Sequence, residues 1–401
     1  MTVMLFCYGS ICEPDIYAYF SALGLTIVNV DLTSNELVYP SSELIKQISD
    51  ELVKESPIIV FTFNFFPILA ELCHIHNVIY LCWSVDCPLL ELFDKAIQYP
   101  TNRIFLFDKA QYDYFYPYNP NCIYYLPLGA NIDRFDYAIQ NITMQDRSTY
   151  SSDVSFIGSL YSEKSPINAL SQLSSHALEC IDAIIENSLK NNDYRIEEEK
   201  ISDNLIVEFK KAGVLFPSGR LIKDLEKYVV ANRYIGYHAT SVDRIQTLNQ
   251  LAKHFRVDLY TGSDAIPLKN VCVHSPVSTL YDMPKVFHLS KINLNMTMKT
   301  IKTGIPLRVF DIMGCRGFLI TNYQSEIPEL FEIGKDLETY SSLEELVDKC
   351  DYYLQHEEVR QKIALQGYQK VCTYHTYPHR LNEMVKVVFS SLQKENKVVW
   401  I

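Results

Sequence analysis

The sequence predicts an α/β protein made of two halves, each built on a parallel β-sheet. At 401 residues the chain is long enough to form two full cores. Short apolar runs recur along it with helical patterns between them, an alternation typical of parallel sheets. The two series of runs are separated by a polar, turn-rich stretch at 132–152, which we interpret as the linker between domains.

The predicted strands follow directly from these apolar runs. In the first half they are residues 3–8, 26–30, 57–61, 78–82, 103–107 and 122–126. In the second half they are residues 154–157, 256–260, 271–273, 291–294, 318–321 and 338–340. A long segment at 165–255, patterned as several helices, interrupts the second half between its first two strands, and we expect it to be a helical insertion.

Composition excludes several classes of function. The net charge of −12 argues against nucleic acid as a partner, because such binding needs a clustered basic surface. The 11 cysteines lie mostly in apolar runs without a C-x-x-C pair, so we expect reduced thiols and no metal site. The apolar residues 1–12 are too few to span a membrane and lack the basic start of a signal peptide. We therefore expect a cytoplasmic protein with no membrane span.

The segment 303–322, TGIPLRVFDIMGCRGFLITN, is the most informative part of the chain. Gly304 opens a loop, Pro306 can begin a helix, and that helix is expected to end at the break from Gly314 to Gly317 before a buried strand. The first turn of a helix presents free N–H groups and the positive end of its dipole. The segment therefore predicts an anion site, suited to a diphosphate.

This segment resembles the Glu-x7-Glu motif of the group 1 glycosyltransferases of the GT-B fold. Asp311 stands at its second acidic position, and five further positions are identical: Gly304, Leu307, Val309, Met313 and Cys315. The stretches SKINLN, GIPLRVFD, WSVDCP and YYLPLGAN are similar to those of the spore-maturation-type glycosyltransferases. The resemblance implies two facing Rossmann-like domains, an acceptor domain at 1–135 and a nucleotide-sugar domain at 150–375, with a helix at 376–401 returning to the first.

The resemblance also implies a donor site in the second half. Residues 154–164, VSFIGSLYSEK, match the family's strand followed by G-R-L-x-x-E-K, so Gly158 and Lys164 are expected at the diphosphate, while Ser159 replaces an arginine. Arg308, where the family has proline, is expected to replace the cation missing at Ser159. The remaining implied contacts are the nucleotide base at Val277, the loop at Gly304, the ribose hydroxyls at Asp311, and Thr303 at the place of the family's first glutamate.

Acceptor-side candidates follow two predicted strands of the first half. Asp86 comes just after a strand and could take the proton from an acceptor hydroxyl, although a turn-stabilising aspartate explains it equally well. Trp83 could stack on a sugar, and Asn64 is a further acceptor-side candidate.

These features together predict a glycosyltransferase that moves a sugar from a nucleotide-diphosphate sugar to a hydroxyl acceptor such as a saccharide, glycoconjugate or protein. A UDP-sugar is the favoured donor, and neither a metal nor another cofactor is expected. A nucleotide-sugar epimerase of the same fold and a catalytically inactive sugar- or nucleotide-binding protein are the alternatives. The charged middle of the 165–255 insertion favours a solvated helical face, with an acceptor platform or a homo-oligomer contact as its functional alternative.

Overall fold

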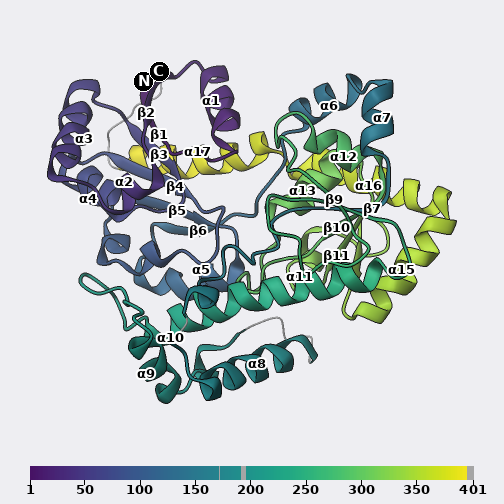
Figure 1. The fold of residues 1–401 in the computed structure, drawn as a ribbon. Coiled ribbons are helices and arrows are strands. Elements are labelled where there is room, and N and C mark those ends of the chain that lie inside the picture. Colours follow the sequence, from purple (N-terminus) through teal and green to yellow (C-terminus); the bar gives the residue numbers. More distant parts are fainter. Residues whose placement is uncertain (171, 191–195, 395–401) are drawn as a thin grey trace. The chain divides into compact units, whose positions relative to one another are not determined.

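The computed structural model describes residues 1–170, 172–190 and 196–394 (Figure 1). They fold into two compact units, each with a six-stranded parallel sheet. The first unit comprises Met1–Gly129, Arg220–Lys223 and the chain from His375 onward, and the second comprises Ala130–Gly219 and Asp224–Tyr374. The predicted α/β class with two Rossmann-like halves is confirmed.

The sheet of the first unit has the strand order β2-β1-β3-β4-β5-β6. Its strands are β1 (Thr2–Cys7), β2 (Thr26–Asp31), β3 (Ile59–Phe63), β4 (Ile79–Trp83), β5 (Asn102–Leu106) and β6 (Ile123–Tyr125). The three central strands β3, β4 and β5 are buried along their whole length, which explains their continuous apolar runs. The order reverses between β1 and β3, where the chain switches sides.

The helices of the first unit alternate with these strands, and the last one comes from the far end of the chain. They are α1 (Glu13–Ala22), α2 (Ser34–Val38), α3 (Ser42–Glu55), α4 (Pro67–Ile75), η1 (Leu90–Phe93), η2 (Lys95–Gln98), α5 (Lys109–Phe115), η3 (Tyr116–Tyr118) and α17 (Tyr377–Lys394). Helix α17 packs on α1, where Tyr19 Oη donates a hydrogen bond to Asn382 Oδ1 at 2.6 Å.

The sheet of the second unit has the order β12-β11-β10-β7-β8-β9. Its strands are β7 (Ser152–Ile157), β8 (Val257–Tyr260), β9 (Cys272–His274), β10 (Ser290–Asn295), β11 (Leu319–Asn322) and β12 (Glu338–Tyr340). Read from β9, this is the doubly wound order of a dinucleotide-binding sheet, with its reversal between β7 and β10. Each of the twelve predicted runs overlaps a strand, with ends displaced by no more than two residues.

The helices of the second unit fall into two groups. Those outside the predicted insertion are α6 (Ile132–Gln140), α7 (Met144–Tyr150), α12 (Met283–Leu289), α13 (Leu307–Gly314), α14 (Ile327–Leu330), α15 (Leu343–Gln355) and α16 (Glu357–Tyr374). The predicted helical insertion contains η4 (Pro166–Ala169), α8 (Ser175–Lys190), η5 (Glu198–Lys200), α9 (Asp203–Lys211), α10 (Glu226–Val229), the π-helical turns η6 (Val230–Gly236) and α11 (Tyr237–Leu251). Most of it packs around a separate hydrophobic core with Ile181, Phe209 and Ile235. The second half of α11 instead packs into the core of the sheet through Leu248 and Leu251.

The stretch at 132–152 is not the irregular linker that its polar composition predicts. It forms α6 and α7, which belong to the second unit, and the side chains of Asn131 and Thr143 cap these two helices. Polar residues at caps and on the exposed faces of short helices explain the weak periodicity. In the described ranges no helix combines the length and apolar character needed to cross a membrane.

Gly317 lies in the connection between α13 and β11, packed closely against α12 and β10. A Cβ atom at this position would lie 2.8 Å from the Phe287 carbonyl oxygen and 2.8 Å from Asn293 Nδ2. The Asn293 amide is itself fixed, because Nδ2 donates to the Phe287 carbonyl at 2.9 Å and Oδ1 accepts from Ser155 Oγ at 3.0 Å. These neighbours have no room to move, so the approach requires glycine.

We therefore expect Gly317→Ala to destabilise the protein by roughly 1–3 kcal/mol through overpacking. The matched control is Gly262→Ala, whose added Cβ would meet only Pro276 Cγ, at 3.8 Å. Chemical denaturation of both variants, followed by circular dichroism, measures the difference. Equal midpoints for Gly317→Ala and the control would contradict this account of the packing.

Candidate functional site

The donor-side candidates of the second unit lie at the point where its strand order reverses. Gly158 and Ser159 follow β7, whereas Thr303 and Gly304 end the loop that follows β10. Because β7 and β10 are neighbours in a parallel sheet, their carboxyl ends share one edge. Ligands of doubly wound sheets bind at this kind of position. The structure thus brings together the two motifs on which the sequence prediction depends.

Helix α13 carries the second motif as expected. Pro306 is its N-cap, Leu307 its first residue and Gly314 its last. The helix makes its first hydrogen bond from Val309 N to Pro306 O at 3.1 Å, and within the described chain no acceptor faces the N–H groups of Leu307 and Arg308. Two open donors at the positive end of a helix make this turn suitable for an anion.

Asp311 and Arg308 form an ion pair on this helix. Asp311 is only 4% exposed, and its Oδ2 lies 3.2 Å from Arg308 Nη1. The Arg308 guanidinium also contacts Met283 Sδ and lies 5.6 Å from the centre of the Phe287 ring. Its charge is therefore partly neutralised by Asp311. Its expected role as a replacement for the cation missing at Ser159 stays a prediction.

Three N–H groups of the loop after β7 are already bonded within the second unit. The N–H of Gly158 continues the sheet by donating to Tyr260 O at 3.1 Å. The N–H groups of Leu160 and Tyr161 donate to Ser263 Oγ and Ser159 Oγ, both at 2.8 Å. These three N–H groups are not available to an anion, and a side-chain cation is a further source of attraction in this loop. Lys164 is exposed there, with its Nζ 5.1 Å from the centre of the Tyr161 ring.

Thr303, at the position of the family's first glutamate, has a carboxylate beside it. Its Oγ1 donates to Glu326 Oε1 at 2.7 Å, and Glu326 is 1% exposed. Glu326 comes from the turn after β11, so the acidic group reaches this place from a different loop than in the resembling motif. The sequence prediction missed it because the partners are 23 residues apart.

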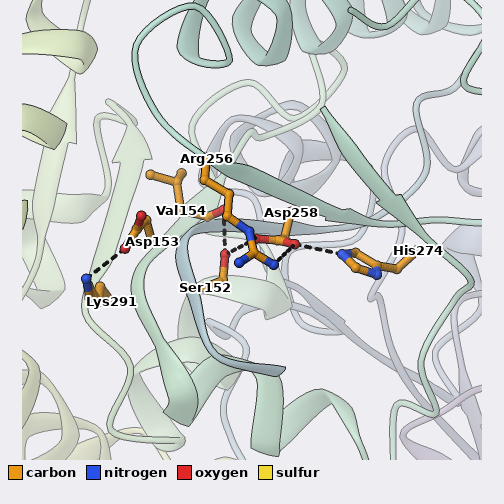
Figure 2. A network of polar contacts seen from close by, with 7 residues as sticks. All are labelled: Ser152, Asp153, Val154, Arg256, Asp258, His274 and Lys291. Atoms are coloured by element: carbon orange, nitrogen blue, oxygen red, sulfur yellow. Dashed lines mark hydrogen bonds and ion pairs between the residues drawn. The ribbon is translucent and has the colours of Figure 1, made fainter. Parts of the chain in front are cut away.

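The loop that contains Val277 is anchored at its start by a buried carboxylate, shown in Figure 2. Asp258 accepts hydrogen bonds from Ser152 Oγ and from His274 Nε2, each at 2.7 Å. Arg256 Nε lies 3.2 Å from Asp258 Oδ2. The His274 ring also stacks on Tyr260, with the ring centres 4.6 Å apart. Asp258 thus ties β7, β8 and β9 together, and the half-buried Val277 follows three residues after this anchor.

In the first unit, Asp86 and Asn64 also lie beside a reversal of strand order, the one between β1 and β3. Asn64 follows β3 and has φ +56°, while Tyr8 follows β1. Asn64 Nδ2 donates to Asp86 Oδ2 at 2.7 Å and to Tyr8 Oη at 3.0 Å. Asn64 Oδ1 accepts from the N–H groups of Val85 at 3.0 Å and Asp86 at 3.3 Å. Asn64 therefore uses both donors and both acceptor positions of its amide.

Two acceptor-side expectations need correction. Trp83 is 0% exposed, and its Nε1 donates to Leu126 O at 3.3 Å, so the ring belongs to the core and cannot stack on a sugar. Asn64 is 6% exposed with its amide fully used, so it positions Asp86 instead of contacting an acceptor. Asp86 itself is exposed, and Oδ1 has no hydrogen bond within the described part of the chain. It is the acceptor-side candidate that the geometry retains.

Tyr8 is a polar group that the sequence prediction missed. Burial raises the pKa of its phenol, and the carboxylates of Asp86 and Glu13 raise this pKa further. Tyr8 therefore stays protonated at neutral pH and can donate its hydrogen. Only the fold reveals this placement, since Tyr8 and Asn64 are 56 residues apart.

Residues 243–386 match the family model described as glycosyl transferase-like. A solved glycosyltransferase from Rickettsia africae aligns over 98% of both chains with a TM-score of 0.55 and 11% identity. The sucrose-phosphate synthase of Thermosynechococcus elongatus aligns over 98% of this chain and 100% of its own, with a TM-score of 0.55 and 8% identity.

The chain has the GT-B fold. Anabaena HepE, solved in complex with UDP-glucose, is a further structure of this kind, with a TM-score of 0.52, 10% identity, and coverage of 97% of this chain and 100% of HepE. At these identities the structures show the fold alone. No curated protein sequence matches the chain significantly.

We expect Asn64→Gly to destabilise the protein by about 1 kcal/mol, because glycine tolerates the positive φ but removes four hydrogen bonds to partly buried or exposed partners. Asn77→Gly is the matched control, since Asn77 has φ +53° and an exposed side chain. Thermal unfolding of both variants measures the loss. If the two variants unfolded at the same temperature, the role of Asn64 as the support of Asp86 would be wrong.

Proposed function

We propose that the protein is a glycosyltransferase that uses a nucleotide-diphosphate sugar, with a UDP-sugar as the favoured donor. The observation that carries the proposal is the pairing of the family-model match at 243–386 with the open N–H groups at the start of α13. The acceptor is a hydroxyl compound such as a saccharide, a glycoconjugate or a protein. The spore-maturation-type subgroup and transfer of a hexose are part of this proposal.

The donor would be held by the second unit. The N–H groups of Leu307 and Arg308 would face the diphosphate, and Lys164 would add a cation from the β7 loop. Asp311 would accept hydrogen bonds from the two ribose hydroxyls, because a carboxylate accepts twice without donating. The base would contact backbone groups near Val277. Fixed cations and dipoles of this kind stabilise the charge that develops on the leaving diphosphate.

The reaction needs a base for the acceptor hydroxyl, and Asp86 is our candidate. Its free Oδ1 would take the proton while Oδ2 stays bonded to Asn64. A nucleotide-sugar epimerase would act without an acceptor, and an inactive binding protein would leave the donor intact. The cytoplasmic location, the absence of nucleic-acid partners and oligomerisation through the 165–255 insertion stay predictions.

A thermal-shift screen with nucleotides and nucleotide sugars tests the proposal. A UDP-sugar at one hundred times its Kd should stabilise the folded protein by about 2.7 kcal/mol, because the ligand binds the folded state. We expect the shift to persist in EDTA, because the donor-site groups described above are organic cations and N–H groups. Chromatography of the incubated sugar nucleotide then separates transfer, epimerisation and no reaction. Failure of every nucleotide and nucleotide sugar to shift the unfolding temperature would reject the proposal.

Asp86→Asn should keep donor affinity and lose transfer, whereas Asp311→Ala should weaken donor binding itself. The reason is that Asp86 belongs to the first unit and Asp311 to the second. We expect a loss of transfer of 10²-fold or more for Asp86→Asn, the usual contribution of a general base. Calorimetric titration with the UDP-sugar, alongside the transfer assay, makes the comparison. Equal losses of donor affinity in the two variants would disprove this division of roles.

A further inference from the structure

Arg244, on α11, is a buried cation next to the loop that follows β7. In that loop this chain has Ser159 where the resembling motif has arginine. Its Nη1 donates to Ser159 O at 2.6 Å, and its Nη2 donates to Met296 O at 2.5 Å. Ser159 follows β7 and Met296 follows β10, so this one guanidinium joins the two loops at the reversal of strand order. It is 8% exposed.

The guanidinium is incompletely satisfied. Its Nε is buried and has no hydrogen-bond partner among the described residues. Buried donors without a partner are rare in folded proteins and call for an explanation, such as an unseen ligand. A phosphoryl oxygen of a bound diphosphate is an acceptor of the right chemistry, because a guanidinium forms short, charge-assisted hydrogen bonds with phosphate.

The charge of Arg244 is also not matched by a bonded carboxylate. Both of its hydrogen-bond acceptors are main-chain carbonyl groups. Asp243, the adjacent acid, lies 2.8 Å from Nζ of Lys299, whose side chain is 1% exposed. Burial lowers the pKa of Arg244, which nevertheless stays charged at neutral pH because an arginine starts so high. Arg244 is therefore a buried cation without a bonded carboxylate in the described part of the chain, a group whose charge a phosphate can neutralise.

The elements η6 and α11, the second of which carries Arg244, are packed closely against the loop that follows β10. Gly236 approaches Thr300 so closely that a Cβ on the glycine would lie 2.8 Å from Thr300 Cγ2. Thr240 Oγ1 accepts from the N–H of Lys299 at 3.0 Å. This approach occurs at the end of the π-helical turns η6, a type of irregularity that often marks functional sites.

We infer that Arg244 supplies the cation that the β7 loop lacks at Ser159, with its Nε–H donating to a phosphoryl oxygen of the donor diphosphate. The inference rests on the proposed function and names a new residue for it. It assigns a part in the site to α11, the helix that packs on the sheet through Leu248 and Leu251. It also makes Arg244 a stronger candidate for this cation than Arg308, whose charge is already paired with Asp311.

The experiment compares Arg244→Met, Arg244→Lys and Arg308→Ala with Arg233→Met, a control at an exposed arginine of the preceding helical turns. The probes are UDP and inorganic pyrophosphate, titrated by calorimetry well below each variant's unfolding temperature. We expect Arg244→Met to weaken both probes by about 100-fold, the scale of one fixed electrostatic partner. Arg244→Lys should lose about tenfold, because an ammonium cannot keep both carbonyl bonds and reach the ligand. Arg233→Met should bind both probes like the parent.

A residue with a merely structural role would lower the unfolding temperature of Arg244→Met and Arg244→Lys without changing the affinity for pyrophosphate, and that result would overturn the inference. If Arg244→Met does not fold, parental affinity in a folded Arg244→Lys protein overturns it equally. A loss confined to Arg308→Ala would assign the cation to Arg308 instead. A parent that binds neither UDP nor any nucleotide sugar rejects the proposed function, whereas a parent and an Arg244→Met variant with equal UDP affinity reject this inference alone.

Discussion

The reversal of strand order in each sheet is the constraint on which the candidate sites depend. Where β7 and β10 lie side by side, the connections that follow them leave in opposite directions. The two loops therefore start from neighbouring strand ends and flank one position at the edge of the sheet. The same happens at β1 and β3 in the first unit. Apart from Val277, which follows β9, every candidate that the structure retains comes from one of these loops, from the first helix after it, or from a residue bonded to it.

The two reversals are held together by different chemistry. In the first unit a neutral amide, Asn64, satisfies a hydroxyl, a carboxylate and two N–H groups, so the loops are joined without charge. In the second unit a cation, Arg244, donates to two carbonyl groups, and its Nε–H has no hydrogen-bond partner among the described residues. Neutral support suits a unit whose exposed Asp86 would receive a proton. Positive support suits a unit that would hold a diphosphate.

The sequence predicted the strands well because burial on both faces of a parallel sheet leaves continuous apolar runs, as in β3 and β4. It also located α13, since Pro306 and the Gly314 to Gly317 break mark the two ends of that helix. The stretch at 132–152 was misread because its helices are short and polar, so their capping residues looked like turn residues. Trp83 was misread because a residue at the end of a strand can point into the core as well as toward a ligand.

Side-chain partnerships across the chain could not be predicted in this way. Arg244 and Ser159 are 85 residues apart, and Thr303 and Glu326 are 23 apart. Ser159 and Thr303 stand where the resembling motif has a charged residue. In each case a residue of that charge, Arg244 or Glu326, lies nearby on another element. No local pattern records this, because hydrogen-bond partners are set by the fold and not by spacing along the chain.

The position of Arg244 has a consequence for how proteins of this kind are recognised as active or inactive. A search that scores the β7 loop alone sees serine in place of arginine and counts a lost function. If the charge has moved to α11, the loop is free to vary, and α11 becomes the part that selection must preserve. Loss of a motif residue and loss of the activity are then separate evolutionary events, and comparing folded neighbourhoods distinguishes them where comparing motifs does not.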